Sequence, residues 1–142
     1  MNNSVIIFIS FCIFSTFANT TVSETSNRRL KMCCARQKDA DKDCRRKFCD
    51  FNALNADSVG SLITTCSRGP TLMRLWDCAS SRVDHTQCCA AKNIQPQCMV
   101  YCNARRILPT DHLYLTCFAA FNAIRDCFRE HLENNANLYG DK

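Results

Sequence analysis

The most regular pattern of apolar and polar positions lies between residues 111 and 133. Apolar side chains recur there at the 3.6-residue period of an α-helix, and charged side chains occupy the opposite face. The preceding Pro109-Thr110-Asp111 is a helix start, because proline suits the first turn and aspartate accepts from free N–H groups. We therefore predict an amphipathic helix over 111–133. Its apolar stripe consists of Leu113, Cys117, Ala120, Phe121, Ile124, Cys127, Phe128 and His131.

Two shorter helices are predicted earlier in the chain. Residues 33–51 contain neither glycine nor proline, and their apolar positions recur at roughly helical intervals. These positions are Cys34, Cys44 and Phe48. A second helix is expected to begin with Asp57 as its N-cap and to end at Gly69. Its apolar side consists of Val59, Leu62, Ile63 and Cys66.

Three further helix starts follow. Pro70 is suited to the first turn of a third helix, Asp84 to capping a short fourth one, and Pro96 to starting a fifth. In the last of these, Cys98 and Cys102 are four residues apart and so share one face. The whole chain has three glycines and no Asn-Gly or Asp-Gly turn, which counts against a β-rich fold. The predicted fold is therefore an all-α domain of about five to six helices.

An apolar run at the N-terminus covers residues 5–14. It is too short to cross a bilayer as a helix, which takes about 20 apolar residues. Ser15-Thr16-Phe17-Ala18 then supplies the small residues that precede a cleavage site. We predict a cleaved signal peptide over residues 1–18, and hence a secreted, extracellular protein.

The segments that flank the predicted domain are polar. Residues 19–32 are interpreted as a polar, basic N-terminal arm without fixed structure, although Arg28-Arg29 would also suit a processing protease. Asn19-Thr20-Thr21 is a sequon and makes Asn19 a candidate glycosylation site. The C-terminal tail, residues 134–142, is polar, so no membrane anchor is expected there.

Cysteine is the most informative residue type in the chain. Of thirteen cysteines, Cys12 lies in the predicted signal peptide, and an even number remains after its removal. An even count in a secreted chain indicates a disulfide framework, here six disulfides. Adjacent cysteines are expected to take different partners, but the pairing stays open among roughly ten thousand connectivities. The twelve are Cys33, Cys34, Cys44, Cys49, Cys66, Cys78, Cys88, Cys89, Cys98, Cys102, Cys117 and Cys127.

The order of these cysteines is a doublet, four single cysteines, a second doublet and four more single cysteines. The middle of the array reads Asp84-His85-Thr86-Gln87-Cys88-Cys89, and Pro96-Gln97-Cys98-Met99-Val100-Tyr101-Cys102 follows. The array resembles the nematode DB domain, a twelve-cysteine extracellular module, over residues 33–128. That resemblance implies secretion and six disulfides in a domain that we place at 33–133. It implies no activity.

No catalytic or metal-binding constellation emerges. Asp84-His85 beside a cysteine doublet loosely resembles secreted phospholipases A2, but the order differs and a glycine-rich calcium loop is missing. Asp39, Asp41 and Asp43 resemble the start of a calcium loop, but Cys44 stands where the turn needs glycine. A zinc site is disfavoured because oxidised cysteines are not zinc ligands. We therefore predict no catalytic residue, no metal and no cofactor, and a protein that is not an enzyme.

Binding is the function class that remains. The net charge of +5 favours solubility and does not by itself indicate nucleic acid. Arg45, Arg46 and Lys47 are a candidate contact for an anionic glycan, although the nearby aspartates would also fit an ordinary solvated face. Phe118, beside the apolar stripe, is a candidate exposed anchor, and the alternative is a packing contact with a neighbouring helix. Our first hypothesis is a module that binds an extracellular protein or receptor. The alternative is an extracellular carrier of a lipid or other small apolar ligand.

Overall fold

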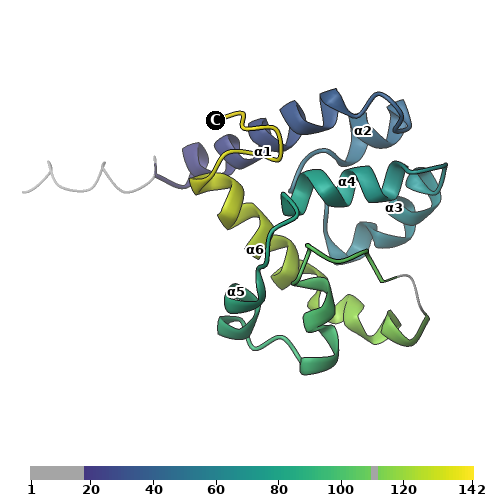
Figure 1. The fold of residues 1–142 in the computed structure, drawn as a ribbon, viewed down its shortest axis with the longest axis vertical. Helices are drawn as coiled ribbons and strands as arrows, with labels where there is room; N and C mark the ends of the chain where they lie inside the picture. Colours follow the sequence, from purple (N-terminus) through teal and green to yellow (C-terminus); the bar gives the residue numbers. More distant parts are fainter. Residues whose placement is uncertain (1–17, 110–111) are drawn as a thin grey trace, which may run out of the picture.

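A computed structural model describes residues 18–109 and 112–142 (Figure 1). Within these residues the chain is helical and has no strand, so the predicted all-α class is confirmed. The α-helices are α1 (Ala18–Arg36), α2 (Lys42–Phe48), α3 (Val59–Cys66), α4 (Thr71–Ser80), α5 (Thr86–Ala91) and α6 (Phe121–Asn134). The 3₁₀-helices are η1 (Ala56–Ser58), η2 (Pro96–Tyr101) and η3 (His112–Ala120). None of the helices described is both long enough and apolar enough to span a bilayer.

All twelve cysteines of the array form disulfides, six in number, as predicted. Three lie within residues 33–78, the first half, and three within residues 88–127, the second half. Both doublets send their two cysteines to different partners, as expected. The pairs are Cys33–Cys78, Cys34–Cys49 and Cys44–Cys66, then Cys88–Cys127, Cys89–Cys102 and Cys98–Cys117.

The two halves repeat one disulfide plan. In each, the first cysteine pairs with the sixth, the second with the fourth and the third with the fifth. The sequence separations are 45, 15 and 22 in the first half and 39, 13 and 19 in the second. The helices correspond too, since the third cysteine lies on α2 or η2 and the fourth is the C-cap of that helix. The fifth lies on α3 or η3, and the sixth on α4 or α6. We conclude that the domain is an internal repeat.

The halves are joined by helix packing, because each of the six disulfides stays within its own half. Helix α6 of the second half packs against α1 and α4 of the first, and in Figure 1 the C-terminal end of α6 lies against α1. Leu30 of α1 and Leu132 of α6 are both fully buried in the core. Packing of apolar side chains therefore holds the two halves together, whereas disulfides cross-link each half internally.

The expectation of an unstructured arm over 19–32 is wrong, because these residues belong to α1. Ser26 and Leu30 are fully buried, and Asn27 accepts a hydrogen bond from the backbone N–H of Phe51 at 2.7 Å. Arg29 donates to two carbonyls at the C-terminal end of α6, at 2.7 and 2.8 Å. The buried face of this segment is mostly polar, so it has no apolar stripe that would have revealed the helix.

The C-terminal tail also belongs to the folded unit and lies beside α1 (Figure 1). Its centre is the buried Asn137, whose side chain donates to the carbonyl of Arg29 at 3.0 Å. The same side chain accepts from the N–H groups of Tyr139 and Asp141 at 2.9 and 3.0 Å. Asp141 in turn pairs with Arg36. The folded unit is therefore wider than the predicted 33–133.

Several predicted helix boundaries need correction. The helix expected over 33–51 breaks after Arg36, and Asp41 caps α2 by accepting from two backbone N–H groups at 2.9 and 3.0 Å. The cap expected at Asp57 is instead made by Asn55.

The helix expected over 111–133 divides into η3 and α6. Pro96 opens its helix as predicted, although that helix is 3₁₀, and Pro70 precedes α4 instead of starting its first turn. Residues 1–17 of the predicted signal peptide and the side chain of Asn19 lie outside the described part of the chain, and both stay predictions.

Candidate apolar ligand site

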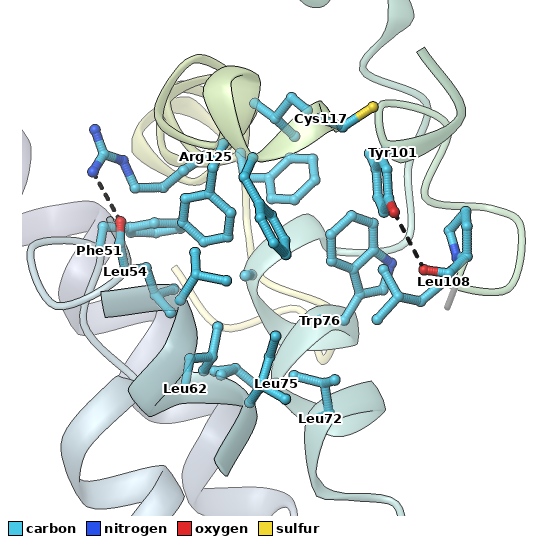
Figure 2. A pocket seen from close by; sticks show the side chains of 18 of the residues that line it. Phe51, Leu54, Leu62, Leu72, Leu75, Trp76, Tyr101, Leu108, Cys117 and Arg125 are labelled. Carbon is cyan, nitrogen blue, oxygen red and sulfur yellow. Dashed lines mark hydrogen bonds between the residues drawn. The ribbon is translucent and has the colours of Figure 1, made fainter. Parts of the chain in front are cut away.

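A cavity of about 340 Å³ lies between the two halves and is lined almost entirely by apolar side chains (Figure 2). The first half supplies residues from Phe51, in the segment after α2, through α4. The second half supplies residues from η2 through α6. The lining residues are Phe51, Leu54, Val59, Leu62, Ile63, Leu72, Leu75, Trp76, Ala79, Tyr101, Leu108, Pro109, Leu115, Cys117, Phe118, Phe121, Ile124, Arg125 and Phe128.

The two walls of the cavity use equivalent positions of the repeat. Counted from the sixth cysteine of each half, the residues six, three and two before it and one after it all line the cavity. In the first half these are Leu72, Leu75, Trp76 and Ala79, and in the second Phe121, Ile124, Arg125 and Phe128. The same face of α4 and of α6, apolar except for Arg125, thus lines the cavity, which lies where the two faces meet.

Aromatic rings close one side of the cavity and connect the halves. Trp76 of α4 meets Phe128 of α6 edge to face, with ring centroids 5.1 Å apart. Tyr101 packs edge to face on Trp76 at 6.3 Å. Such pairs add about 0.5–1.5 kcal/mol each beyond the burial of their area. This wall is therefore a preformed part of the site.

The cavity carries no uncompensated charge among its described lining residues. Arg125 is the single charged one, and its guanidinium donates to the carbonyl of Leu54 at 2.8 Å and to Asp126 at 2.7 and 3.0 Å. Figure 2 shows that guanidinium at the edge of the site, bonded to Leu54, while Trp76 and Tyr101 lie on the opposite side. Tyr101 donates to the carbonyl of Pro109 at 3.5 Å. A ligand with a carboxylate would compete with Asp126 for Arg125, so the lining favours a neutral ligand.

Exposed apolar side chains border the cavity. Ile63 of α3 is 45% exposed, and Leu115 and Phe118 of η3 are 57% and 43% exposed. All three also line the cavity. Phe118, a candidate exposed anchor, thus lies partly exposed at the mouth of a cavity that the sequence did not predict, and its role as an anchor stays a prediction.

The candidate basic residues lie elsewhere, on α2. Arg46 pairs with Asp43 at 2.9 Å, and Lys47 donates to the hydroxyl of Ser61 at 2.7 Å. Arg45 is half-buried. None of the three lines the cavity. Arg46 and Lys47 are therefore already bonded to other residues of the chain. The contact with an anionic glycan stays a prediction.

The residues weighed for catalysis and metal binding have structural partners. Asp39 pairs with Arg74 at 2.8 Å, and Asp41 caps α2. His85 is buried, and its Nε2 lies 2.8 Å from the carbonyl of Ser80. No group of three or more potential metal ligands occurs in the part of the chain that the structure describes.

His85 and His131 pack against each other, and from their lowered pKa values we predict that the protein is less stable in mild acid. Burial lowers the pKa of His85 below its usual 6.5, outweighing the bond to Ser80 and the charge of Asp84. Burial and the neighbouring His85, whose ring centroid is 5.3 Å away, lower the pKa of His131. Well above pH 6.5 both are neutral whether the chain is folded or unfolded. Below it the unfolded chain binds protons first, so the free energy of unfolding decreases as pH falls from about 7 to 5.

Chemical unfolding at a series of pH values measures this effect. His85→Gln keeps an amide that can donate to Ser80 and removes one titrating group, so its stability should depend less on pH over this range. A stability that stays constant or rises as pH falls would contradict the assignment.

Comparison with known proteins gives one match. The family model described as DB module matches residues 33–128, which include all twelve cysteines of the array. No curated protein and no solved structure matches. The N-terminal part of α1 and the C-terminal tail, which pack on the matched region, lie outside it.

Proposed function

The chain belongs to the DB module family, and we propose that it binds a small, neutral, apolar ligand in the cavity between its two halves. The observation that carries the proposal is the cavity itself, about 340 Å³ with an apolar lining. Ligand pockets of proteins are typically about 300–1,000 Å³ and mostly apolar. At roughly 30 Å³ per water-sized group, the space suits on the order of eleven such groups, such as the carbons of a medium-length acyl chain.

The proposed binding of an apolar ligand also explains why apolar side chains are exposed at the cavity mouth. Exposed apolar residues such as Phe118 are the main support for a protein partner, and Phe118 lines the cavity mouth. An opening for an apolar ligand needs apolar side chains at its edge. We therefore place ligand binding before the binding of an extracellular protein.

An extracellular setting is part of the proposal. Six disulfides in a small domain persist in an oxidising compartment and are rare in the cytosol. A secreted protein that sequesters an apolar molecule would keep it soluble in an aqueous environment. Native mass spectrometry of the protein secreted from eukaryotic cells reports cleavage after Ala18 and any co-purified ligand together.

Fluorescence of Trp76, the only tryptophan of the chain, tests ligand binding directly. Titration with 1-decanol or 1-dodecanol is expected to change this emission saturably, because Trp76 lines the cavity. Ala79→Leu fills part of the space and should weaken binding by about tenfold or more, with the free energy of unfolding unchanged or higher because it fills a cavity. The control is Ala35→Leu, which makes the same change at an exposed position of α1.

Two results would overturn the proposal. One is a Trp76 emission that does not respond to either alcohol, together with an empty protein in the native mass spectrum. The other is equal affinity of the wild type, Ala79→Leu and Ala35→Leu, because binding would then occur outside the cavity.

A further inference from the structure

The most exposed apolar side chain reported in the described part of the chain belongs to the segment that leads to the cavity. Ile107 is 85% exposed, and it follows two exposed arginines, Arg105 and Arg106. The next two residues, Leu108 and Pro109, are half-buried and line the cavity. The segment therefore extends from the cavity wall to a protruding isoleucine flanked by positive charge.

Three of the large exposed apolar side chains line the cavity, and a fourth, Ile107, directly precedes the lining residue Leu108 in the sequence. Ile63, Leu115 and Phe118 border the cavity, and Ile107 is joined to its wall through Leu108. The described residues include one other such side chain, Tyr139, on the C-terminal tail. Clustered exposed apolar side chains mark an interaction surface, whereas scattered ones are ordinary. We call Ile63, Ile107, Leu115 and Phe118 the mouth cluster.

Two positive charges, those of Arg105 and Arg106, stand beside Ile107 of the mouth cluster. Neither Arg105 nor Arg106 forms a salt bridge with another described residue, and Asp84 is the carboxylate whose pKa the charge of Arg105 helps to lower. On α2, by contrast, Arg46 is paired with Asp43. Arginines beside protruding apolar residues suit the boundary between phospholipid headgroups and acyl chains, where each class of side chain finds its own solvent. The net charge of +5 acts in the same direction on an anionic surface.

We propose that the mouth cluster docks on an anionic phospholipid bilayer, with Ile107 entering the acyl boundary and Arg105 and Arg106 at the headgroups. The inference rests on the proposed function, because an apolar ligand of this kind resides mainly in membranes. Docking by the mouth lets the ligand pass between bilayer and cavity without crossing water. The bilayer is favoured over a protein partner because the most exposed side chain of the mouth cluster is a single isoleucine beside two exposed arginines, neither of which forms a salt bridge with a described residue.

Co-sedimentation of the oxidised, full-length secreted protein with vesicles tests this docking. The protein should bind vesicles of equal parts phosphatidylcholine and phosphatidylglycerol and bind phosphatidylcholine alone far more weakly. The double variant Arg105→Glu/Arg106→Glu is expected to lower partitioning by about twentyfold or more, near fivefold for each basic residue. Ile107→Ser should lower it as well, without a change in charge. The control, Lys38→Glu/Lys42→Glu, makes the same change of net charge at exposed positions on and before α2.

Three outcomes overturn the inference. The wild type does not sediment with anionic vesicles, or the lysine control loses as much binding as the arginine variant, or Ile107→Ser binds as the wild type does. If the protein does not bind vesicles but 1-dodecanol still changes the Trp76 emission, the docking inference alone fails. The mouth cluster would then be a candidate contact for a protein partner. If vesicles are bound and 1-dodecanol is not, the proposed ligand site fails separately.

Discussion

Replacement of Cys33 and Cys78 by alanine is expected to lower the free energy of unfolding by about 4 kcal/mol. This disulfide joins α1 to α4 across 45 residues, the longest separation of the six. A disulfide stabilises mainly by restricting the unfolded chain, and the restriction grows with the logarithm of the closed length. Guanidinium unfolding of the double variant, compared with the oxidised wild type, measures the loss.

The repeat supplies the matched comparison. Cys88–Cys127 occupies the equivalent place in the second half, with a separation of 39, so its removal should also cost about 4 kcal/mol. Cys89–Cys102 spans 13 residues and should cost about 3 kcal/mol. A loss for the short pair that exceeds both long ones would show that strain or local packing governs these disulfides.

The disulfide plan shows what could be predicted from the sequence and what could not. The even count and the separate partners of Cys33 and Cys34 follow from redox chemistry and disulfide geometry, and both are confirmed. The count alone leaves the pairing open, because it does not distinguish one of the twelve cysteines from another. Comparing the spacings after Cys34 with those after Cys89 reveals the repeat, and this comparison reduces the pairing problem to six cysteines.

Helix α1 and the tail were missed for a physical reason. Periodicity detects a helix by its apolar stripe, but the N-terminal half of α1 buries Ser26 and Asn27, and the tail buries Asn137. These side chains are held by hydrogen bonds to partners far away in the sequence, such as Phe51 and Arg29. Bonds of this kind leave no regular spacing in the sequence.

The cavity was equally out of reach, because its two walls come from different halves of the chain. Phe118 was a candidate for exposure beside the alternative of a packing contact, and its side chain is 43% exposed in η3. The importance of Trp76 and Arg125 becomes visible only once α4 and α6 are known to face each other. Their shared place, two residues before the sixth cysteine, is a signal that the repeat would have supplied.

Truncation of Phe128 to alanine is expected to lower the free energy of unfolding by about 3–5 kcal/mol. Phe128 is buried, and its ring packs on Trp76 at 5.1 Å and on His85 at 4.7 Å. Removing the ring leaves a void between halves that no disulfide connects, and it brings water closer to His85. The pKa of His85 should therefore rise toward its usual 6.5, and the fall of stability in mild acid should become smaller.

Phe121→Ala is the matched control, because Phe121 lies two turns earlier on α6 and also lines the cavity, but is only half-buried. It should cost about 1–2 kcal/mol, since less apolar surface is removed from the core, and leave the pH dependence unchanged. Unfolding of both variants at pH 7 and at mildly acidic pH separates the two effects. Equal losses would mean that the aromatic wall is not what holds the halves together. A large loss with an unchanged pH dependence would instead mean that Phe128 does not shield His85.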